Sequence, residues 1–213
     1  MPLTLDNGDV AAFARTAAAR LDPDRRTVLA IAGPPGAGKT TLAADLSREL
    51  AALGRASALV PMDGFHFDNA VLAPRGWLPR KGAPHTFDAA GYRALIARIR
   101  AEPEAEIAVP VFDRGLDLAR AGAATVPAGA GIVVTEGNYL LLDEAPWRDL
   151  DGLFDLTVFV ETAMEDLAAR LVRRWLDHGH DQASARRRAE VNDLPNAALV
   201  IARSRPADIV WKT

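Results

Sequence analysis

Continuous apolar runs alternate with longer segments of helical periodicity along most of the chain. The runs lie at residues 27–32, 56–61, 131–135 and 153–160. Runs of this kind, flanked by turn residues, are typical of strands that are buried on both faces of a parallel sheet. Helical segments lie between them, over residues 9–21, the stretch that ends near residue 53, 88–100, 162–177 and 181–202. Strands that alternate with helices predict a three-layer α/β fold with a mostly parallel central sheet.

Local signals mark where several of the predicted helices begin and end. Asp9 is suited to cap the first helix, and Gly54 can end the second in the left-handed conformation. Thr162 and Glu165 have the three-residue spacing of a capping box, which predicts a helix that starts there and runs to about residue 177.

The second half of the chain contains weaker strand signals. The apolar segment 106–112 contains Pro110, which predicts an edge strand or the end of a strand. The stretch 113–130 is rich in Ala and Gly and gives no clear prediction. A last strand is expected over 208–211.

The segment 62–87 is rich in Gly, Pro, His and aromatic residues and has no clean period. Segments of this length without regular structure are uncommon in compact domains, where they are either functional or disordered. The aromatic and apolar residues in this one favour order. We therefore expect it to form walls of a binding site for a second substrate.

The composition fits one domain over residues 1–213. Hydrophobic residues make up 49% of the chain, which is enough for a sizeable core. The formal charge of -3 does not indicate a general nucleic-acid or membrane binder. Cysteine is absent, which excludes disulfides, thiolate metal sites and a Cys nucleophile. The polar N-terminus lacks the pattern of a signal peptide and no apolar run is long enough to span a bilayer, so we expect a cytoplasmic protein.

A complete phosphate-binding loop follows the first buried strand. Its pattern, G-x-x-x-x-G-K-[ST], covers Gly33, Pro34, Pro35, Gly36, Ala37, Gly38, Lys39 and Thr40, with Thr41 next in the helix. Glycines allow a tight loop whose backbone N–H groups point at phosphate oxygens, and the helix adds its positive dipole end. Lys39 supplies a charge at the β- and γ-phosphates, and Thr40 offers a hydroxyl to Mg²⁺. The loop predicts nucleotide binding but does not separate kinases from ATPases or GTPases.

Acidic residues follow two of the predicted strands. Ligands bind outside the carboxyl ends of strands in open α/β sheets, so Asp63 is expected near the γ-phosphate, where a carboxylate can accept the proton of a substrate hydroxyl. The alternative is an Asp that starts a turn before Gly64. Glu136, at the end of the third buried run, is suited to hold the hydration shell of Mg²⁺, or is a surface residue at a strand end.

Basic residues gather on the helix 162–177. Arg170, Arg173 and Arg174 have spacings that place them along one side, opposite an apolar face of Leu167, Leu171 and Trp175. Arginines on a mobile helix can cover a transferring phosphoryl group and neutralise its charge. The alternative is a solvated basic face, which is our interpretation of the run 186–188.

Six segments, in this order and with these rough spacings, resemble the uridine kinase, pantothenate kinase and phosphoribulokinase family of P-loop kinases. They are GPPGAGKTT (33–41), MDGFH (62–66), RKGAPHTFD (80–88), VPVFDR (109–114), TEGNYLL (135–141) and RLVRRW (170–175). EGNYLLLD and NDLPNA (192–197) are similar to a bacterial branch of nucleoside-kinase-like, or fructose-transport-associated, kinases. The resemblance spans nearly the whole chain from residue 27 and implies a P-loop NTPase fold with a small helical lid over about 163–190.

The resemblance implies a role for each matching residue. Catalysis is implied for Lys39, Asp63 as general base, Arg170 and Arg174; Mg²⁺ binding for Thr40 and Glu136; and contact with ATP for the loop 33–41, Asn192 and Asn196. The acceptor pocket is implied to include Asp63, Phe65, His66, Lys81, His85, Arg114, Asn138 and Tyr139. Relatives are often dimers or tetramers, which allows a homodimer.

Arg114 is a departure from the family pattern, because uridine kinases have other residues there. Two interpretations stay open: Arg114 binds an anionic group of the acceptor, or it pairs with Asp113 or Asp117 at the surface. The four His residues have no zinc-binding spacing, so the metal we expect is the Mg²⁺ that accompanies ATP.

Three hypotheses for the function follow. The first is a kinase that transfers the γ-phosphoryl group of ATP to a hydroxyl of a sugar, a nucleoside or a pantothenate-like acceptor. The second is a regulatory ATPase, a nucleotide switch that acts on a protein partner through order and disorder of 62–87. The third is a module that binds nucleotide without turnover. A GTPase is disfavoured, since the guanine-reading Asn-Lys-x-Asp segment is missing.

Overall fold

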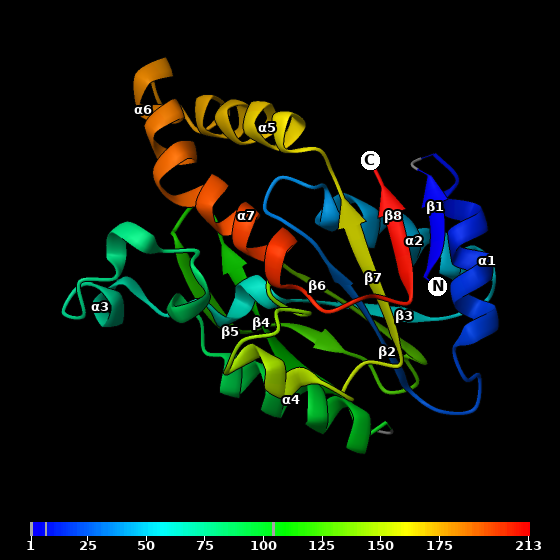
Figure 1. Ribbon diagram of the computed structural model, residues 1–213. Coiled ribbons are helices and arrows are strands. Elements are labelled where there is room, and N and C mark those ends of the chain that lie inside the picture. Colours follow the sequence, from blue (N-terminus) through cyan, green and yellow to red (C-terminus); the bar gives the residue numbers. More distant parts are fainter. Residues whose placement is uncertain (1, 7, 104) are drawn as a thin grey trace.

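Six parallel strands form the central sheet of the computed structural model, which describes residues 2–6, 8–103 and 105–213 (Figure 1). Their spatial order is β1-β8-β7-β2-β6-β3. The strands are β1 (Leu3–Asp6), β2 (Thr27–Ala32), β3 (Ser57–Pro61), β6 (Ile132–Gly137), β7 (Leu156–Glu161) and β8 (Ile209–Lys212). Because all of them run the same way, their carboxyl ends meet at one edge of the sheet, where ligands bind in folds of this kind.

The helices connect these strands and cover both faces of the sheet. They are α1 (Val10–Arg20), α2 (Lys39–Ala52), α3 (Asn69–Leu72), α4 (Ala89–Ala101), α5 (Met164–Asp177), α6 (Gln182–Arg188) and α7 (Leu194–Arg203). A π-helical segment, Ala189–Asp193, joins α6 to α7. The predicted helix 181–202 is therefore confirmed as one continuous helical run, in which the hydrogen-bonding pattern changes in the middle.

Side chains of β2 alternate between two cores, one on each face. Leu29 and Ile31 pack with side chains from α1 and α2. Val28 and Ala30 point to the opposite face, where α4 and the buried Trp147 complete the other core. The helices on the two faces of a parallel sheet confirm the predicted three-layer α/β fold.

A β-hairpin stands apart from the central sheet. Strands β4 (Ile107–Asp113) and β5 (Leu118–Val126) pair antiparallel, with an irregularity between Val109 and Val111. Pro110, which has no N–H to donate, lies at this irregularity. This agrees with the prediction that the segment 106–112 is an edge strand or the end of a strand. The stretch 113–130, which had no clear sequence pattern, thus contains the second strand of the hairpin.

Two local features differ from the sequence interpretation. The capping box is wrong: α5 has Ala163 at its N-cap with no side-chain cap, and the Thr162 hydroxyl instead bonds that of Thr213 at 2.6 Å. Strand β1 was not predicted, because its alternation of half-buried and exposed residues is short and lies at a polar end of the chain. It forms by pairing with β8, far away in the sequence.

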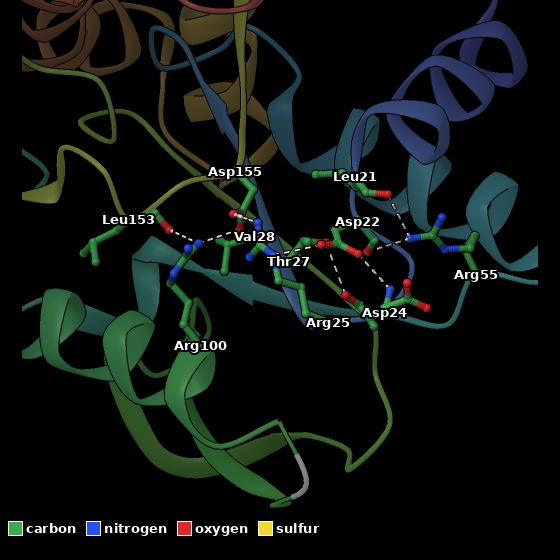
Figure 2. A network of polar contacts seen from close by, with 11 residues as sticks. Leu21, Asp22, Asp24, Arg25, Thr27, Val28, Arg55, Arg100, Leu153 and Asp155 are labelled. Atoms are coloured by element: carbon green, nitrogen blue, oxygen red, sulfur yellow. Dashed lines mark hydrogen bonds and ion pairs between the residues drawn. The ribbon is translucent and has the colours of Figure 1, made fainter.

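A network of charged side chains connects the amino-terminal ends of β2 and β7, on the side of the sheet opposite the carboxyl ends of the strands. Figure 2 shows Asp155 accepting hydrogen bonds from the Val28 N–H at 2.8 Å, from Arg25 at 2.7 Å and from Arg100 of α4. Burial alone would raise the pKa of Asp155, but these hydrogen bonds outweigh it and hold that pKa below its ordinary value. The network joins α4 to the start of β2 and to the segment before β7. We therefore expect it to stabilise the folded state.

No helix within the described part of the chain is long and apolar enough to cross a lipid bilayer.

Candidate active site

A cavity of about 1320 Å³ opens at the carboxyl ends of the strands. Its walls come from the loop after β2, the ends of β3 and β6, the segment 62–87, the tip of the β4–β5 hairpin, and α5 and α6 with the π-helical segment. In Figure 1, α5 and α6 lie beyond the upper ends of the strands. The volume exceeds the roughly 300–1,000 Å³ that is usual for one small ligand, so two substrates can occupy it together.

The phosphate loop follows β2 directly and packs against β7. Gly36 and Gly38 have left-handed φ angles of 83° and 87°, which favour glycine. A Cβ on Gly33 would lie 2.8 Å from the carbonyl oxygen of Val160, so only glycine allows this close approach to β7. The cavity is lined by Pro35, Gly36, Gly38, Lys39, Thr40 and Thr41, while Gly33, Pro34 and Ala37 are buried behind them.

The Lys39 ammonium group is buried at the start of α2. It donates to the Pro34 carbonyl at 2.9 Å and to Asn138 Oδ1 at 2.7 Å. Burial lowers the pKa of Lys39 to about 8, although the carboxylates of Glu136 and Asp63 favour its charged form. The loop therefore holds a poorly solvated cation, which an anionic ligand would stabilise.

Thr40 and Glu136 form an oxygen-rich pair beside Lys39. The Thr40 hydroxyl donates to Glu136 Oε1 at 3.2 Å. Glu136 is the penultimate residue of the fully buried strand β6. It lies in register with Ile31 of β2 and Pro61 of β3, which fixes it between the ends of the two neighbouring strands. Burial raises the pKa of Glu136.

Asp63 lies in a short 3-10 helix, Met62–Phe65, immediately after β3. Its Oδ2 accepts a hydrogen bond from Arg114 Nη2 at 3.0 Å, and its Oδ1 lies 4.0 Å from His66 Nε2. A Cβ on Gly64 would lie 2.4 Å from the carbonyl oxygen of Pro110, so the hairpin packs directly on this 3-10 helix. That packing carries Arg114 to Asp63, and both sequence-based partners for Arg114, Asp113 and Asp117, are wrong.

His66 and Lys81 lie beyond Asp63 in the cavity wall. The His66 ring stacks on Phe87 at 4.0 Å and tilts against Phe112 at 4.6 Å. Burial lowers its pKa to about 4, so the ring is neutral at physiological pH. Lys81 Nζ donates to Asn69 Oδ1 at 2.8 Å and forms an ion pair of 3.0 Å with Asp117.

The arginines of α5 lie along one side of the helix, as their spacing predicts: Arg170, Arg173 and Arg174 border one hollow on its surface. Arg170 and Arg174 also line the large cavity, whereas Arg173 pairs with Asp177 at 2.8 Å. Trp175, expected on the buried face with Leu167 and Leu171, is half-buried and lines the cavity.

Asp193 joins α5 to the π-helical segment. Its Oδ2 accepts from Trp175 Nε1 at 2.7 Å and from Arg174 Nη2 at 3.2 Å, and the residue is only 6% exposed. Charge-assisted bonds to a buried carboxylate hold α5 in a defined orientation over the cavity. Sequence analysis did not single out Asp193.

Three residues expected in the acceptor pocket do not line the cavity. Phe65 packs edge-on against Tyr92, and His85 packs edge-on against Trp77. The Tyr139 hydroxyl donates to the Gly82 carbonyl at 2.6 Å, behind the wall. These side chains pack behind the cavity walls and do not line the cavity itself.

Asn192 and Asn196 line the cavity but contact the segment 62–87. Asn192 Nδ2 donates to the Lys81 carbonyl at 2.8 Å, and Asn196 Oδ1 accepts from Arg80 at 3.2 Å. They connect the helical run 182–203 to the wall that carries Lys81. Their contact with the nucleotide stays a prediction.

Arg187 and Arg188 of α6 also line the cavity, although the run 186–188 was interpreted as a solvated face. The Arg188 guanidinium lies 4.9 Å over the Trp175 ring. The spacing of three and four residues along the helix could have predicted this, because it places four residues on one face. All four line the cavity: Ser184, Arg187, Arg188 and Val191.

Comparison with known proteins shows the family of this chain. The model of the phosphoribulokinase / uridine kinase family matches residues 28–210. The chain belongs to this family. It is accordingly an ATP-dependent phosphotransferase that acts on an alcohol group, and the resemblance drawn from the six sequence segments is confirmed.

Similar proteins match most of its length. The YggC protein of Escherichia coli (strain K12) is 34% identical over 196 residues, which cover 89% of this chain and 79% of YggC. A candidate uridine kinase of Schizosaccharomyces pombe, C227.14, is 30% identical over 221 residues, or 99% of this chain and 94% of that protein. The solved structure of a candidate fructose transport system kinase from Silicibacter sp. TM1040 is 45% identical, has a TM-score of 0.92, and is covered in full by 96% of this chain.

Proposed function

We propose that this chain is a small-molecule kinase that transfers the γ-phosphoryl group of MgATP to a hydroxyl of a sugar, a nucleoside or a pantothenate-like acceptor. One observation carries the proposal: Lys39, the Thr40–Glu136 pair and Asp63 line one cavity at the carboxyl ends of β2, β6 and β3. That arrangement supplies a phosphate cradle, a metal site and a proton acceptor together.

The loop after β2 fits the polyphosphate of ATP. Left-handed glycines at Gly36 and Gly38 and the free N–H groups at the start of α2 form an anion cradle, and Lys39 brings a buried positive charge to it. The bound nucleotide supplies the phosphoryl group for transfer.

Thr40 and Glu136 fit Mg²⁺, which prefers oxygen ligands and retains part of its water shell. The Thr40 hydroxyl and the Glu136 carboxylate already lie 3.2 Å apart. A bound Mg²⁺ would neutralise charge on the phosphates. Glu136 would then hold the ion or its water, and its raised pKa would fall because a cation favours the carboxylate.

Asp63 is the proton acceptor in this proposal. As the acceptor oxygen forms a bond to the γ-phosphorus, its proton passes to the Asp63 carboxylate, and the bond between the γ-phosphorus and the ADP oxygen breaks. Arg170 and Arg174 add positive charge from the α5 side of the cavity. Closure of α5 and α6 would exclude water from the same space.

The first test is ADP release from MgATP with a panel of sugars, nucleosides and pantothenate, for the wild type and Asp63→Asn. Acceptor-dependent ADP release is expected from the wild type. Loss of a general base costs about 10²–10⁴-fold in rate, so the variant should lose transfer while binding of ATP, followed by thermal shift, stays nearly intact.

Equal loss of transfer and of ATP binding in Asp63→Asn would contradict the role of Asp63. ADP release that no acceptor changes would favour the regulatory ATPase, in which the segment 62–87 signals to a protein partner.

A further inference from the structure

The aromatic rings at the acceptor end of the cavity are already stacked. His66 lies between Phe87 and Phe112, with ring centroids 4.0 Å and 4.6 Å away. Phe87 also forms T-shaped pairs with Tyr139 and Trp147. His66 thus fills the place between two rings in which a planar base would stack, so this end favours an acceptor without an aromatic ring.

Lys81 offers no free positive charge at this end. Its ammonium contacts Asn69 Oδ1 at 2.8 Å, the Asp117 carbonyl at 2.6 Å and the Asp117 carboxylate at 3.0 Å, which uses its three donors. It also lies 5.2 Å over the Phe112 ring. Lys81 therefore holds the wall together.

Arg114 is different, because most of its donors are open to the cavity. Within the described part of the chain its polar contact is the one to Asp63, and its side chain is 58% exposed. A guanidinium group has five N–H donors in a planar fork that fits carboxylate and phosphate. Neighbouring carboxylates are occupied: Asp113 pairs with Arg120 and Asp117 with Lys81.

The proposed reaction changes the charge around Arg114. Asp63 supplies the negative charge that faces this guanidinium, and Asp63 becomes neutral when it takes the proton of the acceptor hydroxyl. The cation of Arg114 is then left without its partner unless the acceptor brings a negative charge. An anionic acceptor would restore the pairing and favour the step.

Resting on the proposed function, we propose that the acceptor is a small, non-aromatic hydroxylated anion whose carboxylate or phosphate binds Arg114. Arg114 Nη2 and Asp63 Oδ2 are 3.0 Å apart. An anion held by one and a hydroxyl held by the other, each at about 2.7–2.9 Å, must lie within a few bonds of each other in the acceptor.

The test compares matched acceptors and matched variants. The acceptors are four- to six-carbon polyols, the aldonates that carry a carboxylate in place of one terminal hydroxymethyl group, the corresponding sugar phosphates, and uridine. The variants are Arg114→Gln and Arg114→Lys, with Arg120→Gln as control, since Arg120 lies on the same hairpin, has the same 58% side-chain exposure and does not line the cavity.

We expect the wild type to show at least about tenfold higher kcat/KM for an aldonate or a sugar phosphate than for the matched polyol. A hydrogen bond to a charged group is worth about 1.5–3 kcal/mol, so Arg114→Gln should lower kcat/KM for that anion about tenfold or more. Because Arg114 also contacts Asp63, the variant should affect the matched polyol too, but less, so that the ratio of the two kcat/KM values falls about tenfold. Arg120→Gln should change neither acceptor. Arg114→Lys should retain part of the preference. Comparison of the aldonates with the sugar phosphates shows whether Arg114 binds a carboxylate or a phosphate of the acceptor.

Preference for polyols or uridine, or an equal loss on charged and neutral acceptors in Arg114→Gln, would overturn the proposal. Thermal shift with aldonates and sugar phosphates, in the presence of a non-hydrolysable ATP analogue, is the second measurement. Stabilisation that depends on Arg114 supports the anion site even if no acceptor is phosphorylated, in which case only the kinase function fails. If no anion stabilises the wild type more than Arg114→Gln, the anion site itself is refuted.

Discussion

Replacement of His66 by Phe is expected to make folding less sensitive to acid. The His66 side chain is 10% exposed and stacks between Phe87 and Phe112, and burial lowers its pKa from 6.5 to about 4. Charges around it act in both directions: Asp63 and Asp117 favour the protonated ring, and Lys81 and Arg114 oppose it.

The sign of the effect follows from proton binding in the two states. Between about pH 4 and pH 6.5, His66 of the unfolded chain binds a proton that the folded chain refuses, so acid draws the equilibrium toward the unfolded state. With these two pKa values, the wild type loses about 2 kcal/mol from this group between about pH 7.5 and pH 5. Phe has a similar ring and does not titrate, so the variant should lose about 2 kcal/mol less.

Urea unfolding, followed by the fluorescence of the four Trp residues, measures the free energy of unfolding of both proteins at each pH. Other titrating groups are present in both proteins, so the difference between the two curves isolates His66. If both proteins lose the same free energy, within about 0.5 kcal/mol, the neutral buried state of His66 is refuted.

Three further predictions concern other parts of the molecule. Asp155→Asn should lower the free energy of unfolding by about 1–3 kcal/mol and leave KM for ATP unchanged, because its network lies away from the cavity (Figure 2); urea unfolding and steady-state kinetics check this, and a changed KM would contradict it. Lys39→Met should abolish the rise in Tm that MgATP gives the wild type, and a retained rise in a thermal-shift assay would refute the role of the buried ammonium. Asp193→Ala should raise KM for ATP about tenfold and shift Trp fluorescence emission to the red, because Arg174 and Trp175 of α5 lose their hydrogen bonds to Asp193. Unchanged emission would contradict the role of Asp193 in holding α5.

The parts of the fold that the sequence predicts well are those set by local pattern. The run TVLAIA coincides with β2, Thr27–Ala32, because a strand buried on both faces leaves a continuous apolar signature. Strand β5 escaped prediction because Ala and Gly have weak strand propensity, and pairing with β4 decides its conformation. Tertiary pairing likewise decides β1.

The candidate site also contains a part that local pattern predicts and a part that tertiary packing decides. The phosphate loop, with Lys39 and Thr40, was predictable because one continuous motif contains the whole cradle. The contact between Arg114 and Asp63 joins residues 51 apart and depends on how the hairpin packs over Gly64, which no local pattern encodes. Local charge instead suggested Asp113 and Asp117, which have partners of their own.

The most direct test of the central claim is the fate of the γ-phosphate of labelled ATP. With an active acceptor, the wild type should place the label on the acceptor and Asp63→Asn should transfer about 10²–10⁴-fold less, while both proteins retain ATP binding. Label released only as inorganic phosphate, at a rate that neither the acceptor nor Asp63→Asn changes, would contradict the assignment of this cavity as a kinase site.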